Sequence, residues 1–83
     1  MSIKKEKARP RFLPKTSIRE SFGSLVRDYR MKQGKFIGEV AHDAGITESY
    51  LGMVERGERN ISIDKIANLA KALNVKPKDL FNF

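Results

Sequence analysis

The sequence predicts an all-α fold of five helices, because apolar residues recur at steps of three and four and helix-ending residues separate these segments. The clearest segment spans residues 37–56, where two short helices have the apolar positions Val40, Ala44, Ile46, Leu51 and Val54. Helices that meet at a steep angle need a small residue at their contact and a glycine where the chain reverses. Ala41 and Gly45 stand at those places. The spacing is therefore typical of a helix-turn-helix unit.

A longer helix is predicted before this unit, from about Ile18 to Gln33. Its apolar stripe consists of Ile18, Phe22, Leu25, Val26 and Tyr29. We expect Ser17 to cap its N-terminus and Gly34 to end it in the left-handed conformation. In this interpretation Tyr29 belongs to the core.

Two further helices are predicted after the unit. Ser62 is the expected N-cap of a helix whose apolar face consists of Ile63, Ile66, Ala67, Leu69, Ala70 and Leu73. Asn74 then provides a left-handed exit. Pro77 suits the first turn of a short fifth helix, which presents Leu80 and Phe81. These two apolar residues either cover the core or contact a second copy of the chain.

The composition describes one small domain without a catalytic or metal-binding set. Its 83 residues lie near the lower size at which a hydrophobic core alone holds a fold, so a dimer interface could add burial. With no cysteine and a single histidine, His42, we expect no disulfide, no metal site and no cofactor. No nucleophile or acid–base pair can be assembled, so we expect no catalytic residue and no enzyme. No apolar run is long enough for a signal peptide or a membrane span, which predicts a cytoplasmic protein.

Most of the positive charge lies in an N-terminal arm, residues 1–16, and residues 17–83 form the predicted helical domain. The arm contains six Lys and Arg residues and one Glu, so it carries +5 of the net +7. With two prolines and little apolar periodicity, the arm is predicted to be disordered when free. Its role stays open between a solvated tail and a DNA contact along phosphates or in a minor groove. Packing of Phe12 and Leu13 on the domain or on a partner is a third possibility.

A pattern of residues between Phe22 and Phe81 resembles a known family. It consists of Gly23, Arg27, Arg30, Gly34, Val40, Ala41, Gly45, Tyr50, Leu51, Glu55, Arg56, Gly57, Ala70, Leu73 and Val75. It resembles the Xre family, the Cro and lambda-repressor type of helix-turn-helix domain. The run VERGERNIS, from Val54 to Ser62, is similar to the controller proteins of restriction-modification systems, which set the timing of endonuclease expression. The resemblance implies a five-helix lambda-repressor-like domain.

A helix-turn-helix unit can place its second helix in the major groove of DNA while the first helix crosses the phosphate backbone. The predicted DNA contacts in the second helix are Thr47, Glu48, Ser49, Tyr50, Gly52, Met53 and Arg56, most of them at outward positions. Glu48 is either a capping charge or an acceptor for the amino group of cytosine. Met53 could contact a thymine methyl group, and Gly52 would let the backbone approach the groove.

The resemblances imply further contacts. Similarity to controller proteins adds Arg59 and Asn60 as DNA contacts, although Asn60 could instead bond its own backbone in a polar turn. The Xre resemblance implies an ion pair between Arg30 and Glu55 that links the first helix to the end of the second helix of the unit. It also implies a homodimer formed by the end of the domain, through Leu80, Phe81 and Phe83.

One segment departs from the family pattern. Where the family has leucine, a capping serine or threonine and glutamine, this sequence has Lys35, Phe36 and Ile37. The family's glutamine contacts a DNA phosphate, and Ile37 cannot donate that hydrogen bond. Lys35 could replace the contact, with Phe36 or Ile37 turned inward to fill the space of the leucine. The helix that follows also lacks a hydroxyl cap, and Gly38 weakens it by about 1 kcal/mol relative to alanine.

These inferences predict a sequence-specific DNA-binding transcriptional regulator that acts as a homodimer on an inverted-repeat operator. It would be a restriction-modification controller or a small phage-type repressor. The expected partners are double-stranded DNA and a second copy of the chain, with no membrane and no small-molecule ligand. The alternative is an antitoxin that binds a toxin protein through the basic arm and represses its own operon.

Overall fold

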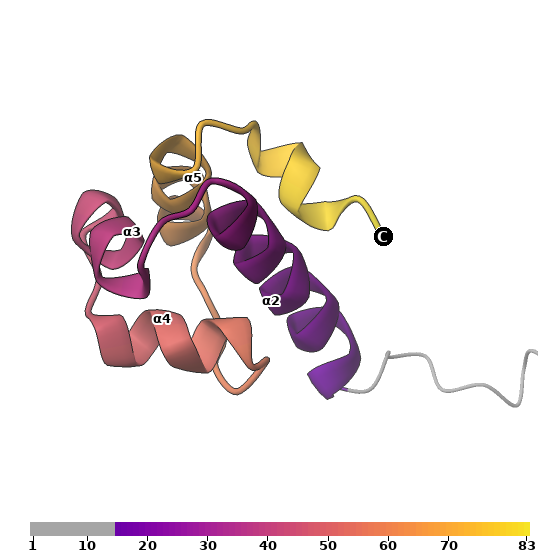
Figure 1. The fold of residues 1–83 in the computed structure, drawn as a ribbon. Helices are drawn as coiled ribbons and strands as arrows, with labels where there is room; N and C mark the ends of the chain where they lie inside the picture. Colours follow the sequence, from indigo (N-terminus) through magenta and orange to yellow (C-terminus); the bar gives the residue numbers. More distant parts are fainter. Residues whose placement is uncertain (1–14) are drawn as a thin grey trace, which may run out of the picture.

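The computed structural model describes residues 15–83, with side chains from Ile18 onward. This part of the chain folds into helices joined by short loops, and it contains no strand (Figure 1). The elements in order are α2 (Lys15–Lys32), α3 (Ile37–Ala44), α4 (Glu48–Glu55), α5 (Ile63–Ala72) and the 3-10 helix η1 (Pro77–Phe81). The all-α prediction is confirmed.

The count of five helices needs a correction, because the last element is a 3-10 helix and the α-helices described are four. Pro77 does occupy the first turn of η1, and the Lys76 N–H donates to Asp79 Oδ2 over 2.9 Å. The element spans five residues, a length at which the tighter 3-10 geometry is common.

The prediction for the start of α2 is wrong. The helix begins at Lys15, so Ser17 lies inside it and is not the N-cap. Lys15 and Thr16, which the sequence assigned to the basic arm, are also helical. The rest of the predicted arm, residues 1–14, lies outside the described residues.

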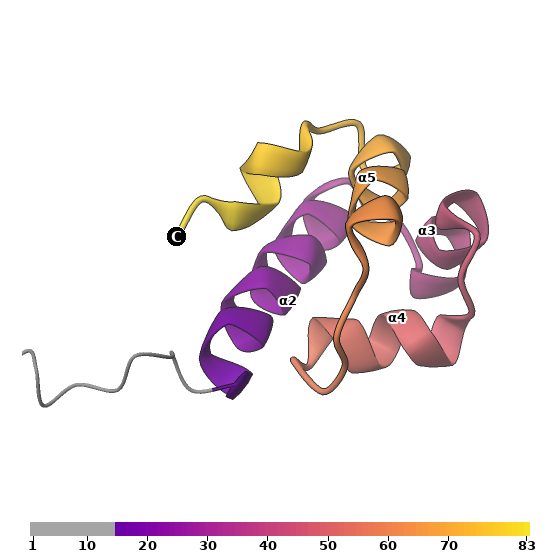
Figure 2. The same ribbon diagram turned by 180° about the vertical axis from the view of Figure 1, so that it is seen from behind.

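The helices pack around one common core. α2 packs against α4 and η1, and α3 packs against α4 and α5, while η1 also contacts α5. Opposite views show α3 and α4 on one side of α2 and η1 on the other (Figures 1 and 2). The α4 helix therefore has its buried side on α2 and α3 and its opposite side free of other helices.

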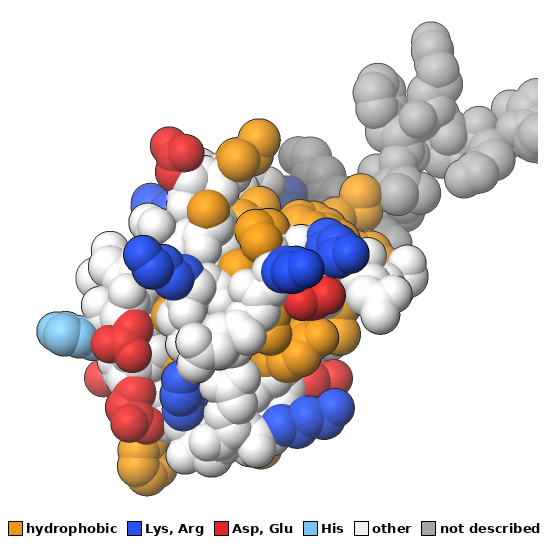
Figure 3. Space-filling view, turned by 90° about the horizontal axis from the view of Figure 1, so that it is seen from above, with side chains coloured by type: hydrophobic (Ala, Val, Ile, Leu, Met, Phe, Trp, Pro, Cys, Tyr) orange, Lys and Arg blue, Asp and Glu red, His pale blue; other side chains and the backbone are white. Residues whose placement is uncertain are grey.

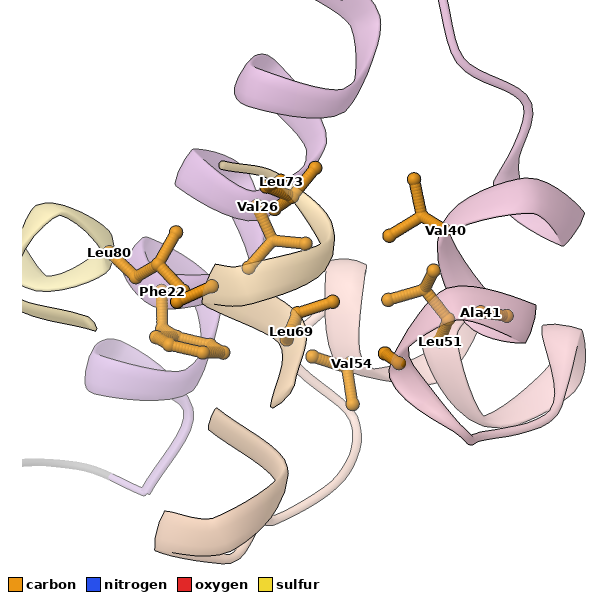
Figure 4. Close-up of a cluster of buried hydrophobic side chains, with 11 residues drawn as sticks. Phe22, Val26, Val40, Ala41, Leu51, Val54, Leu69, Leu73 and Leu80 are labelled. Carbon is orange, nitrogen blue, oxygen red and sulfur yellow. The ribbon is translucent and has the colours of Figure 1, made fainter. Parts of the chain in front are cut away.

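The core draws side chains from all five elements (Figure 4). Its members, each at most 4% exposed, are Phe22, Val26, Val40, Ala41, Ala44, Leu51, Val54, Leu69, Ala70, Leu73 and Leu80. Three residues of the predicted apolar faces are exposed instead. Ile18 (42% exposed) and Ile63 (83% exposed) lie near the starts of their helices, and Ala67 lies within α5. Tyr29 packs against the core as predicted, with part of its surface in solvent.

The predicted chain reversals follow from residues in the left-handed region. Gly34 has a φ of 66° and ends α2, while Gly45 has a φ of 73° and turns the chain between α3 and α4. Around Gly45, the Ile46 N–H donates to Ala41 O over 2.9 Å, which closes α3. Asn74, with a φ of 56°, makes the predicted exit from α5.

The starts of α4 and α5 agree with the sequence. Thr47 Oγ1 accepts from the Tyr50 N–H over 3.0 Å, and Ser62 Oγ accepts from the Lys65 N–H over 3.1 Å. At α3 the residue before the helix is Phe36, which has no hydroxyl to offer. There the Phe36 N–H donates to Glu39 Oε1 over 2.7 Å, so only one half of a capping box is formed.

Candidate nucleic-acid interface

The outer face of α4 is built around its capped start. Thr47 fixes the first turn, and Glu48 and Ser49 follow it with exposed side chains. One turn later Gly52 is buried and Met53 is half-buried, and Arg56 ends the helix with an exposed side chain. The 3.6-residue period therefore presents polar and charged groups on the side away from α2 and α3.

An open hollow brings most of these predicted contacts together. Its lining residues are Ile37, Glu48, Ser49, Gly52, Met53 and Arg56. Five of the six come from α4 and its end, and Ile37 comes from the start of α3. The hollow thus lies along the groove between the two helices of the unit.

Gly52 forms the floor of the hollow. A Cβ atom at this position would lie 3.3 Å from Arg56 Nη1 and 3.7 Å from Ile37 Cδ1. Ile37 is the residue that turns inward, since it packs against the core while Phe36 remains 77% exposed. The absence of a side chain at Gly52 lets Arg56 fold back across α4.

Arg56 is held in place by its neighbour Glu58. Nε and Nη2 of Arg56 donate to the two carboxylate oxygens, each over 3.1 Å. The hydrogen bond and the charge of Glu58 raise the pKa of Arg56 above its ordinary value. Arg56 is therefore a cation paired with Glu58 at one end of the hollow, and Glu48 is an anion at the other end.

A second group of predicted contacts gathers around Tyr50. The Tyr50 hydroxyl donates to Asn60 O over 2.7 Å, which ties the loop after α4 back to the helix. The guanidinium carbon of Arg59 lies 5.4 Å from the centre of the Tyr50 ring, within the range of a cation–π contact. Arg59 and Asn60 both have exposed side chains.

The sequence missed two cations beside this surface. Lys65 Nζ lies 4.9 Å from the centre of the Tyr50 ring, and Arg27 of α2 lines a hollow together with Ile37 and Arg56. Arg27 was part of the family pattern, but nothing in the sequence placed it near α4. Both residues become neighbours of α4 only through the packing of the helices, so spacing alone could not reveal them.

Lys35 is not brought together with the α4 face. Its Nζ donates to Ala72 O over 3.1 Å, and beside it Gln33 Nε2 donates to Leu73 O over 2.7 Å. Both acceptors are carbonyls at the C-terminal end of α5, which need partners. A phosphate contact by Lys35 stays a prediction, and it would require Lys35 to leave Ala72 O.

Arg30 and Glu55 form a nearly buried ion pair. Arg30 Nε donates to Glu55 Oε2 over 2.6 Å and Nη2 to Oε1 over 3.0 Å, and their side chains are 14% and 6% exposed. Arg30 Nη1 also donates to Lys35 O over 3.0 Å. The hydrogen bond to Glu55 raises the pKa of Arg30. The pair joins α2 to the end of α4.

The three residues predicted to form a dimer interface differ in their exposure. Leu80 is fully buried in the core, so its side chain has no surface to offer to a second copy, and its assignment to a dimer interface is wrong. Phe81 and Phe83 are 43% and 62% exposed, and the ring centres of Phe22 and Phe81 are 5.1 Å apart. Figure 3 shows hydrophobic side chains gathered on the side of η1, with lysines and arginines around them.

Other kinds of site are absent from the part of the chain that the structure describes. There, no three histidine, aspartate or glutamate side chains lie close enough together to hold a metal ion. Among the same residues, no helix has the length and apolar character that crossing a membrane requires.

The geometry agrees with comparisons to known proteins. Residues 26–80, more than half of the chain, match the family described as Helix-turn-helix. The chain belongs to the helix-turn-helix family.

Several relatives are regulators. Over 68 residues the chain is 40% identical to control protein C.BamHI of Bacillus amyloliquefaciens, which covers 81% of this chain and 84% of that protein. The crystal structure of the restriction-modification controller protein C.AhdI from Aeromonas hydrophila matches with a TM-score of 0.75 at 40% identity, over 76% of this chain and 96% of that one. The biofilm regulator SinR, solved in complex with DNA, matches with a TM-score of 0.69 at 31% identity, over 74% of this chain and 98% of that one. The predicted similarity to controller proteins is confirmed.

Proposed function

We propose that this protein is a sequence-specific DNA-binding transcriptional regulator whose α4 helix reads the major groove. The observation that carries the proposal is the outer face of α4, where Glu48, Ser49, Met53 and Arg56 line one open hollow. A single α-helix fits the major groove, which is about 12 Å wide. The relation to SinR, which has been solved with DNA bound, supports the same use of this surface.

The hollow offers complementary chemistry for base edges. Arg56 is a cation whose planar donor fork suits the two acceptors of guanine, provided that it leaves Glu58, to which Nε and Nη2 donate in the free protein. The Glu48 carboxylate suits the amino group of cytosine. Ser49 can donate or accept a hydrogen bond, and Met53 offers an apolar surface to a thymine methyl group. These four side chains are the proposed readers of the sequence.

Phosphate contacts are proposed for the cations around the reading helix. Arg59 and Lys65 flank Tyr50 at one end of α4, and Arg27 lies beside Arg56 at the other. Contacts of this kind position a protein on DNA and provide affinity without reading sequence. A cytoplasmic location is part of the proposal, because a DNA-binding regulator must reach the DNA.

A homodimer on an inverted-repeat operator is the proposed working form. The exposed rings of Phe81 and Phe83 support a dimer surface at η1, on the side of α2 opposite α4. A two-fold dimer would present two α4 helices to two half-sites about one helical turn, roughly 10 base pairs, apart. Identity to C.BamHI and C.AhdI over most of each chain supports a restriction-modification controller in particular.

Selection from a random duplex pool tests this function. Purified protein is equilibrated with the pool, bound duplexes are amplified over several rounds, and the products are sequenced. We expect a pseudo-palindromic motif, and Ser49→Ala or Met53→Ala should change preference at one or two positions per half-site, by about 1 to 3 kcal/mol each. A pool that stays random, or variants that select the unchanged motif, would contradict reading by α4.

A further inference from the structure

The side chain of Glu48 folds back over the first turn of α3. A Cβ atom built at Gly38 would lie 2.5 Å from Glu48 Oε2 and 3.1 Å from its Cδ. The carboxylate therefore occupies the space that any larger residue at position 38 would fill. This contact connects the base-reading face of α4 to the start of α3, beside the place where Ile37 lines the same hollow.

The glycine at position 38 is there for space and not for backbone conformation. Among the described glycines, those with positive φ are Gly34, Gly45 and Gly57, so Gly38 has a φ that any residue adopts. It is the second residue of α3, where glycine weakens a helix relative to alanine. The gain that offsets this weakness is room for Glu48.

The position of the Glu48 carboxylate is electrostatically favourable. The first-turn N–H groups of Ile37 and Gly38 find no acceptor within the described chain, and they form the positive end of the α3 dipole. Glu48 is also the first residue of α4, so its charge lies near the N-terminal turns of two helices. Both helices favour a negative charge in this place.

We propose that Gly38 is a positioning residue that seats Glu48 and thereby fixes the base preference of the reading helix at one position of each half-site. The inference rests on the DNA-binding function proposed above. Seated on Gly38, the carboxylate stays at one end of the hollow and has one approach to a base edge. Its target is an exocyclic amino group in the major groove, which cytosine presents as N4.

Two substitutions act on the Glu48 carboxylate in different ways. Glu48→Ala removes the carboxylate, whereas Gly38→Ala keeps it and displaces it. The atoms that obstruct a Cβ at position 38 belong to the end of a flexible side chain, so Gly38→Ala should fold and should melt no lower than wild type. Its effect on binding would then come from where the carboxylate lies.

A double-mutant cycle on the full chain tests the proposal. Wild type, Gly38→Ala, Glu48→Ala and the double variant are titrated with the selected operator and with operators that carry each other base pair at every half-site position. We expect Glu48→Ala to reduce the preference at one position by about 5- to 150-fold, the range of one specific base contact. Gly38→Ala should change the preference at the same position by at least about fivefold. In the Glu48→Ala background it should change nothing.

Two controls separate seating from other effects. Asp43→Ala removes a carboxylate from the other end of α3, where the side chain is 57% exposed, and it should alter affinity for all duplexes evenly. Glu48→Asp shortens the side chain without touching Gly38, and it should change the preference at the same position as Gly38→Ala.

The outcomes also distinguish this inference from the proposed function. If wild type selects no motif, the DNA-reading function itself fails. If wild type selects a motif but Gly38→Ala keeps the wild-type preference, or keeps its effect after Glu48 is removed, then Gly38 does not position Glu48 and the inference is overturned.

Discussion

Breaking the ion pair between Arg30 and Glu55 should strongly destabilise the junction of α2 and α4. Glu55→Gln keeps the shape of the side chain but removes its charge, and the new amide group can accept only one of the two bonds that Arg30 donates. Arg30 then remains 14% exposed with an uncompensated charge. Removing one partner of a buried pair costs about 3 to 5 kcal/mol.

That loss is large against the whole stability of the domain. A chain of this size has a free energy of unfolding of roughly 4 to 12 kcal/mol, taking about 0.05 to 0.15 kcal/mol per residue. Urea unfolding followed by circular dichroism, at one fixed protein concentration because a dimer would add stability, measures the change. Glu58→Gln is the control, because it breaks an exposed pair: the side chain of Arg56 is 60% exposed and that of Glu58 is 53% exposed. This variant should leave the unfolding midpoint unchanged.

The cost of an uncompensated charge can be separated from the value of the pair. Replacing both partners, as Arg30→Met with Glu55→Leu, removes the buried charges together and should recover much of the stability lost in Glu55→Gln. If Glu55→Gln loses no more stability than Glu58→Gln, the pair is not buried in solution and the reasoning is refuted.

Three further outcomes follow from the same structure. Gly23→Ala should strongly lower the melting temperature, because the new Cβ would overlap Val54 O and lie 2.6 Å from Glu55 O, and backbone atoms of a packed helix cannot shift without cost. A Gly23→Ala variant that melts at the same temperature as Gly38→Ala would show that α2 and α4 do not approach each other this closely. Thr47→Ala should cost about 1 kcal/mol of unfolding free energy through loss of the cap on α4, and an unchanged urea midpoint would contradict the bond to the Tyr50 N–H. Residues 1–14 carry five basic residues and one acidic residue. Deleting them should make the slope of log affinity against log salt shallower by about 0.9 for each lost phosphate contact, and it should weaken binding to all duplexes similarly. Equal slopes for the two proteins would mean that the arm does not touch DNA.

The sequence predicted those features that depend on neighbouring residues. Gly34, Gly45 and Asn74 were assigned to left-handed positions, and Thr47 and Ser62 to helix caps, because each effect acts within one turn of the chain. The start of α2 was misplaced because Ser17 can cap a helix but equally tolerates a place within its first turn.

Features that depend on packing were beyond the sequence. Periodicity could not decide whether Phe36 or Ile37 turns inward, because Phe36 is the residue just before α3 and Ile37 is the first residue of α3, where the helical period is not yet established. Leu80 was placed at a surface because apolar residues near the end of a domain serve a core and an interface equally well. Most of the predicted readers do line one hollow on α4, but the contact of Glu48 with Gly38 joins residues ten positions apart and required the fold.

The most direct test of whether α4 reads the DNA sequence is a chemical footprint on the selected operator that reports on the major groove. Dimethyl sulfate methylates guanine N7, which lies in the major groove, and protein bound there protects it. We predict protected guanines in two half-sites whose centres are about 10 base pairs, or a multiple of that, apart, with the protection lost in the Arg56→Ala variant at one guanine per half-site. Guanines that remain fully reactive across the bound operator, or protection of a single asymmetric site, would contradict a dimer that reads the major groove through α4.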